Sequence, residues 1–259
     1  MRVLRAIRYV TPLREGGSMP AIVEADDASL YVLKFRGAGQ GPKALVAEWL
    51  VGELARACGF HVPEIVGLEV DNALGRNEPD PEIRDLLRAS HGLNLGLRYL
   101  PGAITYDPAA PPQPDAALAS ALVWFDAFTM NVDRSPRNPN LLWFEHALWL
   151  IDHGAALYPH HAWASAASAQ NSTFAPVRDH VLLPLASELE AQGARLRATI
   201  EALDLAALTA ALPDAWLVAD NTVGDAGALR TAYEVFLRAR LQAAPRFTEE
   251  AARARTLLV

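Results

Sequence analysis

Hydrophobic and polar residues alternate in short runs through the first hundred residues of the chain. The runs cover residues 3–10, 19–25, 30–35, 62–70 and 93–100. A two-residue period places alternate side chains on opposite faces of an extended strand. Asp26-Asp27-Ala28-Ser29 supplies turn-forming residues between the second and third runs. The pattern predicts a β-rich amino-terminal part with a hairpin near its start.

Two segments in the same part of the chain have helical spacing instead. Pro42 stands at a favourable position to open a helix, and apolar residues recur at helical intervals as far as Cys58. Gly59 follows as a helix stop. These signals predict one main helix over residues 42–58, and a short second helix is expected over residues 81–90.

The pattern changes after Pro101-Gly102, where residues 107–114 form a proline-rich stretch typical of a linker. Beyond it we expect a long buried helix over residues 116–130, a short strand over 148–152, and helices from about residue 178 onward, with breaks near Pro213 and Pro245. Thr248-Glu249-Glu250 is the predicted start of the last helix. The fold class is therefore α+β, divided into residues 1–101 and a helical part over 102–259.

Composition and charge argue against some classes of function for this chain. Hydrophobic residues make up 51% of the 259 residues and charged residues 20%, as in ordinary globular proteins. The net charge of -7 gives no bulk attraction for nucleic acid or anionic membranes, so no direct nucleic-acid partner is expected. The most apolar stretch contains Asp126 and is too short to span a bilayer, and the first residues lack the apolar run of a signal peptide. The single cysteine, Cys58, excludes an internal disulfide, and a cytoplasmic location is the expectation.

The strongest candidate chemistry lies in the stretch Asn131-Val132-Asp133-Arg134-Ser135-Pro136-Arg137-Asn138 and in the later Ile151-Asp152-His153-Gly154. Asp133 is a candidate general base, because a carboxylate can accept the proton of an attacking hydroxyl group. Asn138 and Asp152 are candidate Mg2+ ligands, because this ion prefers oxygen donors. Each residue alone could instead cap a turn, but the ordered set favours phosphoryl transfer.

A matching set lies upstream. Lys34, in the apolar strand ending at Phe35, and Glu48, in the main helix, could form the ion pair that orients ATP phosphates. The alternative places both side chains in solvent. Gly16, Gly17 and Ser18 could direct backbone N–H groups at phosphate oxygens, although a plain hairpin turn explains them equally well. With this pair upstream, the α+β pattern predicts a two-lobed protein-kinase-like fold, with a β-rich N-lobe, one main helix and a helical C-lobe.

Other polar residues give weaker signals. Arg134 and Arg137 could screen phosphates or pair with acidic neighbours, but solvation at the surface is the simpler interpretation. His153, His160 and His161 lie close to Asp152 but lack the fixed spacing of a metal-binding motif. The tryptophans fall in apolar runs, which favours the core over a base-stacking surface.

The order of these residues resembles the HipA-like kinases and, more distantly, the phosphoinositide 3-/4-kinase core, over roughly residues 10 to 185. The resemblance implies ATP and Mg2+ as cofactors, with the roles above for Lys34, Glu48, Asp133, Asn138 and Asp152. It also implies a hinge that binds adenine near Arg98, Tyr99 and Leu100. The chain departs from the family's toxins in length and at three positions, namely Ser135, Arg137 and His153.

The prediction from sequence is therefore an ATP- and Mg2+-dependent phosphotransferase. The favoured acceptor is a serine or threonine of a protein, which remains unidentified. Two alternatives stay open, a kinase of a small molecule or lipid headgroup and a nucleotide-binding pseudokinase that acts as an interaction module. A phosphorylation site at Ser18 within its loop is a further guess.

Overall fold

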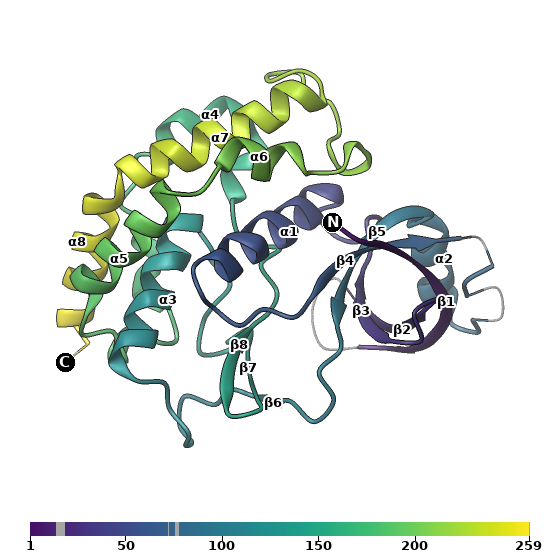
Figure 1. Cartoon of the computed structure of the whole chain (residues 1–259), viewed down its shortest axis with the longest axis horizontal. Coiled ribbons are helices and arrows are strands. Elements are labelled where there is room, and N and C mark those ends of the chain that lie inside the picture. The colour runs from purple at the N-terminus through teal and green to yellow at the C-terminus, as the bar shows by residue number, and fades with distance from the viewer. Residues whose placement is uncertain (14–18, 72, 76–77, 259) are drawn as a thin grey trace.

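The computed structural model describes residues 1–13, 19–71, 73–75 and 78–258. It has a mixed α+β fold in which five strands near the amino terminus close into a barrel (Figure 1). Around the barrel the strands run in the order β1 (Val3–Pro12), β2 (Ala21–Ala25), β3 (Leu30–Lys34), β5 (Gly92–Arg98) and β4 (Ile65–Val70). Parallel pairing of β1 with β4 closes the ring, and every other pair is antiparallel.

The barrel follows from the alternation in the sequence. Its interior holds a cluster of its own, which includes Val23, Tyr31, Leu33 and Leu68. The predicted hairpin turn forms where the Ala25 N–H donates to the Ser29 carbonyl at 2.9 Å. The strand expected over residues 62–70 is shorter than predicted and begins at Ile65.

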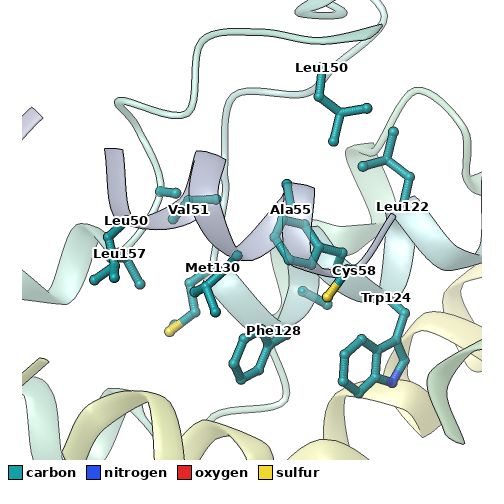
Figure 2. Close-up of a cluster of buried hydrophobic side chains, with 14 of the residues drawn as sticks. Leu50, Val51, Ala55, Cys58, Leu122, Trp124, Phe128, Met130, Leu150 and Leu157 are labelled. Carbon is teal, nitrogen blue, oxygen red and sulfur yellow. The ribbon is translucent and has the colours of Figure 1, made fainter. Parts of the chain in front are cut away.

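The main helix, α1 (Pro42–Ala57), begins at the predicted residue and ends one residue earlier than predicted, with Cys58 as its C-cap. Pro42 occupies its first turn, and Gly59 follows it with a φ of 89°, a left-handed conformation that favours glycine. The inner face of α1 packs on the helical part of the molecule, away from the barrel interior. Figure 2 shows Cys58, which follows α1, near Trp124 and Phe128 of α3, and Leu50 of α1 beside Leu157.

The helical part surrounds α3 (Ala116–Thr129), the predicted buried helix. The other helices are α2 (Pro81–Ala89) at the barrel, α4 (Trp163–Ala169), α5 (Leu189–Glu201), α6 (Leu205–Ala210), α7 (Ala226–Gln242) and α8 (Ala244–Thr256). Four 3-10 turns are described at η1 (Tyr158–Ala162), η2 (Ala175–Asp179), η3 (Leu183–Leu185) and η4 (Asp214–Trp216). In Figure 1, α1 lies between the barrel and this layer of helices.

The remaining strands form a small sheet in the order β6 (Ile104–Thr105), β7 (Leu141–Phe144) and β8 (Ala147–Leu150). The sequence predicted β8 but missed β6 and β7. The predicted start of the last helix at Thr248 was also wrong, because α8 begins at Ala244 with Pro245 in its first turn. None of the described helices is both long and apolar enough to cross a membrane.

Candidate active site

Three charged side chains lie close together, one each from β3, α1 and the segment that follows β8. Lys34 lies at the end of β3 between the buried residues Leu33 and Phe35, so its side chain points away from the barrel interior. Its Nζ lies 2.5 Å from Asp152 Oδ1 and 3.6 Å from Glu48 Oε2. The pairing of Lys34 with Glu48 was predicted from sequence, whereas its direct contact with Asp152 was not.

Burial and charge set the protonation of this group. Burial lowers the pKa of Lys34, but the charges of Glu48 and Asp152 outweigh burial and leave the pKa raised. Burial raises the pKa of Glu48, yet the charge of Lys34 and the contact with His153 hold it well below its ordinary value. Lys34 is therefore a cation and Glu48 an anion at neutral pH. His153, fully buried, places Nδ1 3.5 Å from Glu48 Oε1.

Asp133 lies in the loop after α3, where two side-chain amides hold one of its carboxylate oxygens. Asn138 Nδ2 donates to Asp133 Oδ2 at 2.9 Å, and Asn140 Nδ2 donates to the same oxygen at 3.3 Å. Asn140 Nδ2 also donates to the Asp133 carbonyl at 2.8 Å, while the Asp133 N–H donates to Asn131 Oδ1 at 3.1 Å. Among the described residues, no hydrogen bond is made to the other carboxylate oxygen, Oδ1.

One cavity of about 360 Å³ brings the predicted residues together. Lys34, Glu48, Asp133, Asn138 and Asp152 all line it. The cavity is within the size range of small-molecule sites. Its remaining walls come mainly from the linker after β3, the first turns of α1 and the segment after Asp152, and include Phe35, Gln40, Leu45 and Ala155.

The predicted hinge residues lie outside this cavity. Arg98, Tyr99 and Leu100 are not among the residues that line this cavity. The Arg98 N–H donates to the Glu64 carbonyl at 2.8 Å, and the Tyr99 N–H donates to the Leu30 carbonyl at 2.9 Å. Gly16, Gly17 and Ser18 fall outside the described residues.

The oxygen donors in this cavity suit a hard cation that takes most of its other ligands from water and substrate. Because Asn138 directs its amide nitrogen at Asp133, its amide oxygen is free to face a metal ion. Asp152, with 39% of its side chain exposed, lines the same cavity and offers a carboxylate there. Mg2+ is commonly held by one or two protein oxygens together with phosphates and water. Among the described residues, no cluster of three His, Cys, Asp or Glu side chains could hold a metal by itself.

Sequence reasoning missed the residues behind Asp133. Arg134 is only 2% exposed, and its Nε lies 2.5 Å from Asp126 Oδ2, so the preferred interpretation as a solvated surface residue was wrong and the alternative of an acidic partner holds. Asn131 and Asn140, which contact Asp133 directly, had been given no role. The available signal was a charged Asp126 inside an otherwise apolar helix, because such a charge requires a buried partner.

Comparisons with known proteins identify the family. The family model for HipA-like kinases matches residues 6–243, which is most of the chain. No curated protein matches the sequence. The crystal structure of the Helicobacter pylori proinflammatory kinase CtkA is similar in fold, with a TM-score of 0.55 at 11% sequence identity. That match covers 98% of this chain and 99% of the other. From the family match across residues 6–243, the chain belongs to the HipA-like kinases.

Proposed function

We propose that this kinase transfers the γ-phosphoryl group of ATP, with Mg2+, to a serine or threonine hydroxyl group of a protein. The observation that carries the proposal is the convergence of Lys34, Glu48, Asp133, Asn138 and Asp152 on one cavity. In this proposal residues 1–101 act as the N-lobe and residues 102–259 as the C-lobe, and the cavity lies where they meet.

Lys34 is the proposed contact to the α- and β-phosphates. Its ammonium group is a compact point charge, and phosphate oxygens would share it with Asp152 once a nucleotide is bound. Glu48 keeps this cation pointed into the cavity, because their charges attract across 3.6 Å in a site shielded from water. Mg2+, held by Asn138 and Asp152, would neutralise charge that develops on the transferred phosphoryl group.

Asp133 is the proposed general base. The acceptor hydroxyl oxygen bonds to the γ-phosphorus, the bond from that phosphorus to the bridging oxygen of ADP breaks, and the hydroxyl proton passes to the carboxylate. Amides of Asn138 and Asn140 hold Oδ2, so the free Oδ1 is the oxygen that receives the proton.

The nucleotide's remaining contacts are proposed from the family resemblance. Arg98, Tyr99 and Leu100 would form the hinge to adenine. Since the amides of Arg98 and Tyr99 pair within the barrel, the Leu100 amide is the one donor of the three left without a partner in the described chain. Gly16, Gly17 and Ser18 would cover the phosphates.

Nucleotide binding is tested by thermal unfolding with ATP, with and without Mg2+. A ligand that binds only the folded state raises the melting temperature by mass action. We expect a rise with ATP that increases when Mg2+ is added. Asp152→Ala should lose most of the Mg2+-dependent part. An unchanged melting temperature for the unaltered protein under both conditions would contradict the proposal.

Catalysis is separated from binding by Asp133→Asn. Asparagine keeps the shape and accepts the same amide hydrogen bonds, but it cannot take up the hydroxyl proton. The variant should keep the ATP-dependent rise in melting temperature and lose phosphoryl transfer by about 100-fold or more. Turnover at the normal rate in this variant would show that Asp133 is not the base.

The acceptor is identified by incubating the kinase and γ-labelled ATP with cell lysate, using Asp133→Asn as the matched control. Labelled serine or threonine in a protein, present only with the unaltered kinase, supports the proposed acceptor. Label confined to small molecules or lipids would assign the alternative acceptor class, and ATP binding without any transfer would identify a pseudokinase.

A further inference from the structure

A buried ionic network lies beneath the loop that carries Asp133. Asp126, in the last turn of α3, and Arg134 both have fully buried side chains, and His180 is almost fully buried beside them. Asp126 Oδ2 lies 2.5 Å from Arg134 Nε and 2.9 Å from His180 Nε2. Asp126 Oδ1 accepts a hydrogen bond from Asn131 Nδ2 at 3.2 Å. A single carboxylate thus holds three side chains, two from the loop that follows α3 and one from the distant His180.

The hydrogen bonds define the charge of this network. The Leu182 N–H donates to His180 Nδ1 at 3.0 Å, so the ring proton sits on Nε2 and points at Asp126. His180 is therefore neutral. One carboxylate and one guanidinium remain, which balance each other in a site without solvent.

Arg134 extends this network to the loop itself. Its NH1 donates to the Asn140 carbonyl at 2.5 Å and to the Pro139 carbonyl at 3.4 Å. Its own carbonyl accepts from the Val181 N–H at 3.0 Å. Arg134 therefore joins the end of α3, the far end of the loop and the segment after His180.

These contacts reach Asp133 from two sides. Asn131, held by Asp126, accepts the Asp133 N–H. Asn140, held through its carbonyl by Arg134, donates to the Asp133 carbonyl and to Oδ2. The network thus holds the two residues that fix the backbone and the carboxylate of Asp133.

We propose that Arg134, oriented by Asp126 and His180, is a positioning residue that sets the orientation of Asp133. The proposal rests on the proposed role of Asp133 as the base. A buried ion pair adds little stability compared with well-packed apolar residues, so its contribution here is the geometry of the loop.

Arg134→Lys tests this role. Lysine keeps the positive charge but replaces a planar fork with a single ammonium, which cannot reach Asp126 and the Asn140 carbonyl in the same way. A small displacement of a catalytic group is enough to cost about 100-fold in rate. We expect the variant to bind Mg2+–ATP within about threefold of the normal affinity, while kcat for phosphate release from γ-labelled ATP falls about 10- to 100-fold.

Arg240→Lys is the matched control. Arg240 is also fully buried, and it donates to the carbonyls of Ala127 and Phe128 at the end of the same helix, and to those of Gln170 and Ser172. None of these partners lies in the loop of residues 131–140. The control should lower the melting temperature while leaving kcat near normal.

Hydrogen exchange measured by mass spectrometry gives a second readout that needs no turnover. Peptides covering residues 131–140 should exchange faster in Arg134→Lys than in Arg240→Lys or the unaltered protein. Normal kcat in Arg134→Lys, equal kcat losses in both variants, or a loss of ATP affinity as large as the loss of kcat would each overturn the proposal. Should the unaltered protein show neither phosphate release nor transfer to a protein in lysate, the proposed function fails, and the exchange comparison decides on Arg134 alone: equal exchange in both variants would overturn it.

Discussion

Two residues of the buried network respond to acid in different pH ranges. Burial raises the pKa of Asp126, but Arg134 and His180 outweigh it and hold the pKa at about 2. Burial lowers the pKa of His180 and Arg134 adds to this effect, while Asp126 opposes it without restoring the ordinary value. The folded state therefore resists protonation at both residues.

This protonation behaviour predicts how stability falls with acid. The unfolded chain protonates His180 below about pH 6.5, whereas the folded chain keeps it neutral. The contribution of His180 to the free energy of unfolding is therefore complete above that pH and is lost as the pH falls. The contribution of Asp126 is lost later, as the pH falls from about 4 towards its folded pKa of about 2. Urea unfolding should give a lower free energy of unfolding at pH 5.5 than at pH 7.5.

His180→Gln provides the control for that measurement. Glutamine can still donate to Asp126 but has no group that titrates in this range. Its free energy of unfolding should change less between pH 7.5 and pH 5.5 than that of the unaltered protein. The remaining slope is assigned to other histidines, including His160, whose pKa is lowered chiefly by burial. An identical slope in both proteins would exclude His180 as a source.

At the residue scale, local motifs predicted which side chains gather at the cavity. Asp133 and Asn138 lie five residues apart in one loop, so their meeting follows from local geometry. The burial of Arg134 could not be predicted in this way, because its surroundings depend on His180, 46 residues later, which reaches Asp126 only through tertiary packing. Spacing along the chain carries no information on such a contact.

Among the elements, α3 and α5 pack closely at a glycine. A Cβ atom placed on Gly193 of α5 would lie 2.5 Å from Trp124 Nε1 of α3. The indole cannot easily move, since its N–H donates to Thr248 Oγ1 at 2.8 Å and its ring packs against Phe247, with 5.3 Å between the ring centroids. The small residue at position 193 is thus required for the approach of the two helices.

Gly193→Ala should therefore destabilise the protein, although alanine favours a helix by about 1 kcal/mol over glycine. Overpacking costs about 1–3 kcal/mol, so we expect a net loss measurable as a lower urea midpoint. Gly227→Ala, at an exposed position in α7, is the control and should be neutral or stabilising by up to about 1 kcal/mol. A stabilising effect at position 193 would show that the interface tolerates the extra carbon.

Helix ends could be predicted from residues beside them in the sequence, whereas strands that depend on distant pairing could not. Pro42 and Gly59 marked both ends of α1 because each acts on the backbone beside it. The predicted break near Pro245 is confirmed, since α7 ends at Gln242, but α8 already begins at Ala244 because proline is favourable in a first turn. Strand β7 was missed because its place depends on pairing with β8 and β6.

At the scale of the whole molecule, residues 214–220 attach the helical part to the barrel side. The indole N–H of Trp216 donates to the Leu93 carbonyl of β5 at 3.0 Å, and Arg36 NH2 donates to the Ala215 carbonyl at 3.3 Å. Lys43, in the first turn of α1, pairs with Asp220 at 3.6 Å. These contacts join segments that are more than a hundred residues apart, and β5 leads directly to the proposed hinge.

Trp216→Phe tests whether this attachment couples the two parts. Phenylalanine keeps most of the apolar volume but leaves the Leu93 carbonyl without its donor, which costs about 1–3 kcal/mol. We expect a lower free energy of unfolding and faster hydrogen exchange in β5 and in residues 214–220 than in α3. Trp143→Phe is the matched control, because the Trp143 indole N–H is buried without a hydrogen-bond partner in the described chain and its loss should change stability little. Exchange that rises equally in β5 and α3 would mean that the barrel and the helices already unfold as one unit, and that Trp216 contributes only to their common stability.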